Sequence, residues 1–75
     1  MTVIAPRIAV DPQVQSGKPV IEGTRVPVSV VVGAVAAGDS IEEVAREYAI
    51  MPQDVRAALG YAAKLLEGET VRAPQ

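Results

Sequence analysis

The chain has 75 residues, of which 49% are hydrophobic, and it contains no Cys and no His. These figures exclude a disulfide framework and a metal site built from thiolate or imidazole ligands, and the formal net charge of −2 gives no overall basic field that would attract nucleic acid. A chain this short buries only about 60% of its unfolded surface, so we expect a single domain over residues 1–75 that gains stability from a second subunit.

The first part of the chain, residues 7–28, predicts an arm of short strands and turns. Residues 7–10, 20–22 and 25–28 are rich in β-branched side chains, and turns that contain Pro or Gly lie between them. Two or three strands of this length are not stable alone. We therefore expect the arm either to pack on the helices that follow or to pair across a dimer.

Residues 29–68 predict a unit of three helices, followed by a frayed tail at 69–75. The first helix, from about residue 27 or 29 to residue 37, is apolar or small on all sides, and Gly38 follows it at the position of a left-handed C-cap. A helix of this kind is buried on two sides. One side can face its own core, and the other is a candidate subunit interface.

The second and third helices have the clearest starts. Ser40 to Glu43 fits a capping box, and Pro52 occupies a favoured first helical position. Only residues 49–51 connect these two helices, which indicates the steep crossing of a helix-turn-helix. The sequence therefore predicts a mainly α fold, in which short N-terminal strands precede a three-helix unit with a helix-turn-helix.

A polar face on the third helix is a candidate DNA-binding surface. Its members recur at helical spacing and are Gln53, Arg56, Ala57, Gly60 and Lys64. Arg can bond guanine and Gln can bond adenine from such a helix, and Arg46 of the second helix adds a cation. The alternative is that these residues only solvate an exposed face, which periodicity alone favours. Glu42, Glu43 and Glu47 of the second helix argue against phosphate contacts.

The candidate interface with a second subunit or another partner combines the strand arm with the outer side of the first helix. Its members are Ile8, Val10, Val20, Ile21, Arg25, Val26, Val30 and Ala34. Arg25 is a lone cation in an apolar segment. It either pairs with Asp11 or Glu22 or contacts a partner.

Nothing in the chain predicts catalysis, a metal or a cofactor. The Ser residues occupy turn or cap positions without a base nearby in the sequence, and the nine carboxylates follow helix surfaces without a convergent metal pattern. The longest apolar run, residues 26–37, is too short to span a membrane, and the N-terminus lacks the features of a signal peptide. We therefore expect a cytoplasmic binding protein that is not an enzyme.

Several segments resemble one bacterial and archaeal family. They are VDP at 10–12, SGKPVI at 16–21, GTRVPV at 23–28, SIEEVAREY at 40–48 and DVRAAL at 54–59. Together they resemble the family called domain of unknown function four-three-three, over about residues 7–66. The resemblance implies a homeodomain-like three-helix fold preceded by short strands, often dimeric. One departure is Met51, where family members often carry a Thr or Ser cap whose loss typically costs about 1 kcal/mol.

The resemblance also implies a role as the antitoxin of a type II toxin–antitoxin pair, similar to the VapB antitoxins. The antitoxin would form a homodimer, bind and neutralise a PIN-like toxin ribonuclease, and help repress its own operon by placing the third helix on operator DNA. Two alternatives remain open, a stand-alone DNA-binding regulator and a protein–protein adaptor without DNA binding. The net charge of −2 favours the adaptor.

Overall fold

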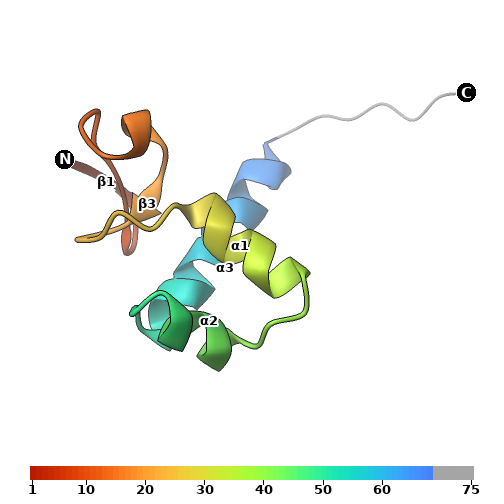
Figure 1. Ribbon diagram of the computed structural model, residues 1–75. Coiled ribbons are helices and arrows are strands. Elements are labelled where there is room, and N and C mark those ends of the chain that lie inside the picture. The colour runs from red at the N-terminus through yellow and green to blue at the C-terminus, as the bar shows by residue number, and fades with distance from the viewer. Residues whose placement is uncertain (69–75) are drawn as a thin grey trace, which may run out of the picture.

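The computed structural model describes residues 1–68 and has a three-stranded antiparallel sheet followed by three helices (Figure 1). The strands are β1 (Thr2–Ala5), β2 (Ile8–Val10) and β3 (Val20–Ile21), in the spatial order β1-β2-β3, and a 3-10 turn at Gln15–Gly17 lies between β2 and β3. The helices are α1 (Val28–Ala36), α2 (Ile41–Glu47) and α3 (Pro52–Glu67), and α3 packs against the other two. Within residues 1–68, no helix is long and apolar enough to cross a membrane.

The prediction of a mainly α, homeodomain-like fold is wrong, because the strands form a layer of the domain rather than an arm. Ile8 and Ile21 lie opposite each other across β2 and β3, and both side chains are buried in the same core as the helices. The fold is therefore α+β. Of the two placements expected for the strands, packing on the helices is the one observed.

The strand boundaries also differ from the prediction. Residues 2–5 form β1 and pair with β2, although the sequence predicted no strand before residue 7. Residues 25–28 form no strand, since Pro27 makes only an isolated bridge with Val20 and Val28 begins α1. Pro27 has no amide hydrogen with which to continue a ladder, and it serves instead as the N-cap of α1.

The sheet is covered on both faces. Ile8 and Ile21 face the helices, whereas the neighbouring cross-strand pair, Ala9 and Val20, points to the opposite face. Ala9 and Val20 are nevertheless buried. Together with Val14, from the loop after β2, they line a small cavity of about 260 Å³. That loop therefore covers the outer face of the sheet.

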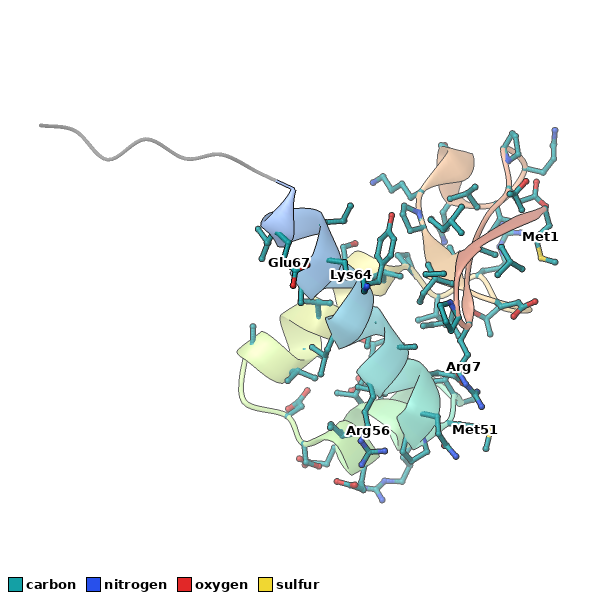
Figure 2. The ribbon with its side chains drawn as sticks, turned by 180° about the vertical axis from the view of Figure 1, so that it is seen from behind. Met1, Arg7, Met51, Arg56, Lys64 and Glu67 are labelled. Carbon is teal, nitrogen blue, oxygen red and sulfur yellow. The ribbon has the colours of Figure 1, made fainter. Side chains whose placement is uncertain are left out.

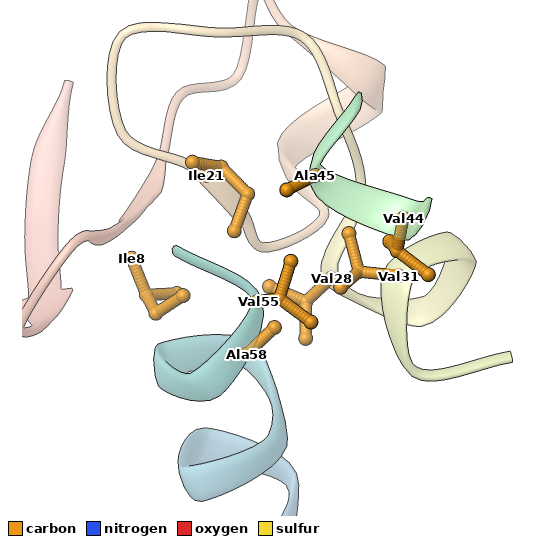
Figure 3. Packing of buried hydrophobic residues seen from close by; sticks show 8 residues of the cluster. All are labelled: Ile8, Ile21, Val28, Val31, Val44, Ala45, Val55 and Ala58. Atoms are coloured by element: carbon orange, nitrogen blue, oxygen red, sulfur yellow. The ribbon is translucent and has the colours of Figure 1, made fainter. Parts of the chain in front are cut away.

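Side chains from all three helices meet Ile8 and Ile21 in one core (Figure 3). The largest helix side chains without solvent exposure are Val31 of α1, Val44 of α2 and Val55 of α3. The buried hydrophobic residues of the described chain are all Ile, Val or Ala. Each of these side chains buries little area, so the helices and the sheet approach closely around a small core.

The predicted helix boundaries at Ser40, Pro52 and Gly68 are confirmed. At the start of α2, the Glu43 amide donates to Ser40 Oγ (3.0 Å) and the Ser40 amide donates to Glu43 Oε1 (2.8 Å), which completes the capping box. α3 begins at Pro52 and has Gly68 as its C-cap. The predicted tail at residues 69–75 lies outside the described residues.

Candidate functional site

The outer side of α3 carries the predicted DNA-binding residues. Gln53, Arg56, Gly60 and Lys64 are exposed, and Ala57 is half-buried. Figure 2 shows Arg56 in the first half of α3 and Lys64 in the second half. The polar stripe therefore follows the helix, but its two cations lie about 12 Å apart along the axis.

The turn between β1 and β2 flanks this polar stripe. Arg7 Nη1 lies 2.8 Å from Asp54 Oδ1, which holds the turn against the first part of α3. Figure 2 shows Arg7 beside this part of the helix. Pro6, from the same turn, lines a shallow groove of about 210 Å³ together with Gly60 and Lys64. The turn therefore contacts α3 at two places, through Arg7 at Asp54 and through Pro6 beside Gly60 and Lys64. Gln53 and Arg56 do not line this groove.

Charges on α2 oppose the binding of a phosphate backbone beside α3. Glu42, Glu43 and Glu47 are exposed, and Arg46 is the cation of this helix. The Ser40 amide and then the Ser40 hydroxyl donate to the Glu43 carboxylate, and with the nearby Arg46 they lower its pKa below the ordinary value of 4.5. Glu43 is therefore charged at neutral pH, and α2 presents three negative charges against one positive charge.

Only part of the predicted subunit interface is accessible on the surface of the monomer. Three of them are buried within the monomer and stabilise this chain's own fold: Ile8, Val20 and Ile21. Three more are half-buried: Val10, Val26 and Ala34. The two that are exposed are Arg25 and Val30. The β-branched composition of these segments correctly indicated strands, but the chain itself covers the three buried side chains.

Arg25 makes no ion pair within residues 1–68, so the predicted pairing with Asp11 or Glu22 is not observed. Arg25 and Asp11 do line the same small cavity beside the sheet. Gln15 Nε2 donates to the Arg25 carbonyl oxygen (3.1 Å), which holds the backbone at this position. The side chain is exposed.

A broad apolar groove between α1 and α3 was not predicted from the sequence. It has a volume of about 580 Å³, and its lining residues include Val32 and Gly33 of α1 and Tyr61, Ala62 and Leu65 of α3. The spacing of Tyr61 and Leu65 could have indicated this groove. They lie four residues apart and form a second apolar row on α3, beside the row that faces the core. An apolar groove of this kind can receive side chains of another protein.

A family model described as "Protein of unknown function (DUF433)" matches residues 8–62, from the start of β2 to within α3. The chain belongs to the DUF433 family. The resemblance found in the sequence strings is thus confirmed at the level of the family. β1 and the last turn of α3 lie outside the matched residues.

Two solved structures share the DUF433 fold. The chain is 36% identical to Rv2018 from Mycobacterium tuberculosis, with a TM-score of 0.65, and the match covers 69% of this chain and 24% of that one. It is 29% identical to a DUF433 member protein from Anabaena variabilis ATCC 29413, with a TM-score of 0.73, covering 81% of this chain and 61% of that one. The match therefore spans about a quarter of the first protein and three fifths of the second. No curated protein matches the chain.

The described surface of this DUF433 chain offers two kinds of binding chemistry. α3 presents polar side chains that can donate hydrogen bonds, and β1 and the groove present apolar side chains. Within residues 1–68, no three potential metal-ligating side chains converge.

Proposed function

We propose that this DUF433 chain is the antitoxin of a type II toxin–antitoxin pair, which acts in the cytoplasm by binding a PIN-like ribonuclease. The proposal rests on the family strings and on one structural observation, the exposed apolar edge strand β1. Within residues 1–68, β1 pairs with β2 on one side, and its other edge has no partner strand. Val3 and Ile4 of this strand are 49% and 42% exposed.

The two exposed side chains make β1 suited to an extended segment of another protein. Val3 lies opposite Ala9, and Ile4 is the next residue, at a shift in the register, so two neighbouring apolar side chains are exposed on this strand. A partner strand added to the open edge would satisfy the free backbone groups and cover both side chains. A register shift between Val3 and Ala5 bends the strand, which disfavours indiscriminate edge-to-edge pairing.

Charge adds a second reason for a ribonuclease partner. A protein that binds RNA presents basic groups to the phosphates. The net charge of −2 and the three exposed carboxylates of α2 complement such a surface. An antitoxin of this charge is attracted to the basic region of such an enzyme and would compete with RNA for it.

Recovery of the partner from the native host tests this proposal. Tagged chain should co-purify with a small ribonuclease in stoichiometric amount, identified by mass spectrometry, and should inhibit its activity. Val3→Lys with Ile4→Lys should abolish the recovery, whereas Met51→Lys, at a site with similar exposure (51%), should not. If the chain is recovered alone while a control toxin–antitoxin pair survives the same conditions, the antitoxin proposal is wrong.

A second candidate function is a stand-alone DNA-binding regulator. The observation that favours it is the exposure of Gln53 and Arg56 in the first half of α3, neither of which lines the groove beside the β1–β2 turn. Salt-dependent binding of the isolated chain to its own upstream region would support this candidate. If no DNA is bound even in the presence of the protein partner, the chain is a protein–protein adaptor.

A further inference from the structure

The backbone hydrogen bonds of β2 determine which groups of β1 face the open edge of the sheet. The Glu22 amide donates to the Arg7 carbonyl oxygen (2.8 Å). The next residues along the two strands, Ile8 and Ile21, lie opposite each other. In an antiparallel ladder, pairs that exchange hydrogen bonds alternate with pairs that exchange none. Ile8 and Ile21 are therefore a non-bonded pair, and the following residue of β2, Ala9, directs its N–H and C=O to β3.

Val3 is the residue of β1 that lies opposite Ala9. Because the backbone groups of Ala9 are directed to β3, Val3 and Ala9 form a non-bonded pair, and the N–H and C=O of Val3 point away from β2. Thr2 has the opposite orientation and faces Val10. The register shift between Val3 and Ala5 then interrupts the alternation. Val3 therefore presents the regular backbone donor and acceptor of this edge.

The side chain of Val3 is the exposed member of an apolar row across the sheet. Residues directly opposite each other in antiparallel strands share a face, so Val3 lies on the same face as Ala9 and Val20, away from the helices. Ala9 and Val20 are 1% and 4% exposed, whereas Val3 is 49% exposed. The loop that covers this face over β2 and β3 thus leaves the row open at β1.

We infer that the ribonuclease docks an extended, antiparallel segment in register with Val3. One residue of that segment accepts a hydrogen bond from the Val3 amide and donates one to the Val3 carbonyl oxygen. Its side chain is apolar and extends the row of Val3, Ala9 and Val20 by one strand. Antiparallel pairing closes both bonds with a single partner residue, whereas parallel pairing needs two. The inference rests on the proposed antitoxin function and specifies the partner segment that this function requires.

Two observations favour a segment of another protein over a nucleic acid or a second copy. The backbone donor and acceptor of Val3 lie beside an apolar side chain, and a residue of an extended polypeptide complements all three at once. A second copy would bring the same net charge of −2 and the same exposed carboxylates of α2, which repel each other. The basic surface of an RNA-binding enzyme is instead attracted to them.

Val3→Pro tests the backbone contact. It removes the outward amide hydrogen without removing a hydrogen bond of the sheet, and Pro is tolerated at sheet edges. The probe is the ribonuclease recovered with the tagged wild-type chain, and isothermal titration calorimetry measures its Kd. Val3→Pro should raise this Kd by about tenfold or more. Val3→Ile keeps the amide and an apolar side chain and should change it by less than about threefold. Circular dichroism checks that both variants are folded.

A second pair of variants tests the side-chain contact and does not depend on the backbone change in Val3→Pro. Val3→Asp keeps the amide but places a charge in the apolar row, so it should also raise the Kd by about tenfold or more. Met51→Asp is the matched control, because Met51 is similarly exposed (51%) and lies at the start of α3, where Asp is a favourable cap. It should leave the Kd unchanged.

The outcomes separate this inference from the antitoxin proposal. If the wild-type chain recovers no ribonuclease, both are wrong. If the ribonuclease binds Val3→Pro and Val3→Asp as tightly as the wild-type chain, only the docking at Val3 is wrong, and the antitoxin role would use another surface. If the two substitutions weaken self-association in sedimentation velocity but leave ribonuclease binding unchanged, the edge of β1 pairs with a second copy and the inference is overturned.

Discussion

Arg7 Nη1 and Asp54 Oδ1 lie 2.8 Å apart, so an ion pair joins the β1–β2 turn to the first turn of α3 across 47 positions of sequence. At the same time Asp54 Oδ2 accepts the Met51 amide (2.9 Å). Met51 has no side-chain oxygen with which to cap α3, and Asp54 provides only the reciprocal half of a capping box. One carboxylate therefore both caps the helix and anchors the sheet.

Asp54→Ala is expected to destabilise the domain by about 1–2 kcal/mol, because it removes a helix cap and an ion pair together. Arg7→Met removes only the ion pair between partly exposed groups and should cost less than about 1 kcal/mol. Urea unfolding followed by circular dichroism measures both changes. Equal losses for the two variants would show that the Met51–Asp54 hydrogen bond contributes no stability.

Glu43→Gln is expected to make the domain less sensitive to acid. The capping box lowers the pKa of Glu43 in the folded chain below the ordinary value of 4.5. The folded chain binds this proton more weakly than the unfolded chain, so the stabilisation is complete above the unfolded pKa and is lost as pH falls through the folded pKa. Gln keeps an oxygen acceptor for the Ser40 amide but does not titrate.

Thermal unfolding between about pH 3 and pH 6 checks this expectation, because this interval brackets the ordinary pKa of Glu. The unfolding temperature of the wild-type chain should fall more steeply with acid than that of Glu43→Gln. Parallel profiles would mean that the capping box does not shift the titration of Glu43.

Two glycine substitutions are expected to have opposite effects on stability. Gly38 follows α1 with φ +111°, so Gly38→Ala should cost about 1–2 kcal/mol. Gly60 lies within α3, and a Cβ there would meet nothing within 4 Å. Gly60→Ala should therefore stabilise the domain by up to about 1 kcal/mol through helix propensity. Chemical denaturation measures the free energy of unfolding of both variants. A loss of stability in Gly60→Ala would contradict the expectation that a Cβ fits at this position of α3.

Arg56→Ala tests the nucleic-acid candidate without disturbing the core, because the Arg56 side chain is exposed. If α3 reads bases, this variant should bind a duplex from its own upstream region about tenfold more weakly or worse, since a specific Arg–base contact contributes about 1–3 kcal/mol. Fluorescence anisotropy at two salt concentrations measures the affinity. Lys18→Ala, away from the polar stripe of α3, is the control, and unchanged affinity of Arg56→Ala would exclude Arg56 from a DNA site.

Local signals predicted the helices well, but they did not predict the fold class. The capping box at Ser40 and the proline at Pro52 are short-range features whose physics lies within one helical turn, and both boundaries are observed. The fold class depends instead on the packing of Ile8 and Ile21 against the helices. That contact joins residues far apart in sequence, and a run of β-branched residues favours a strand without showing which element will bury it.

The candidate surfaces were predictable only in part. Periodicity identified the polar stripe of α3 correctly, because an amphipathic helix exposes its polar side chains. The same periodicity could not show that Pro6 lies beside Gly60, since this proximity depends on β1 and on the ion pair of Arg7 with Asp54. The groove between α1 and α3 depends on how the two helices cross, which no spacing within either helix determines.

Because the sheet is covered on both faces, its strands should unfold locally in a definite order. β2 is the strand with hydrogen-bonded neighbours on both edges, and it is packed by the helices through Ile8 and by the loop after β2 through Ala9. β1 has one neighbour and an exposed edge, so its amides can exchange with solvent by local fraying. Amides of β2 that are bonded within the sheet can exchange only when the sheet separates from the helices. Partner docking on β1 would therefore slow exchange in a strand that is otherwise free to fray, while leaving the slow exchange of β2 unchanged.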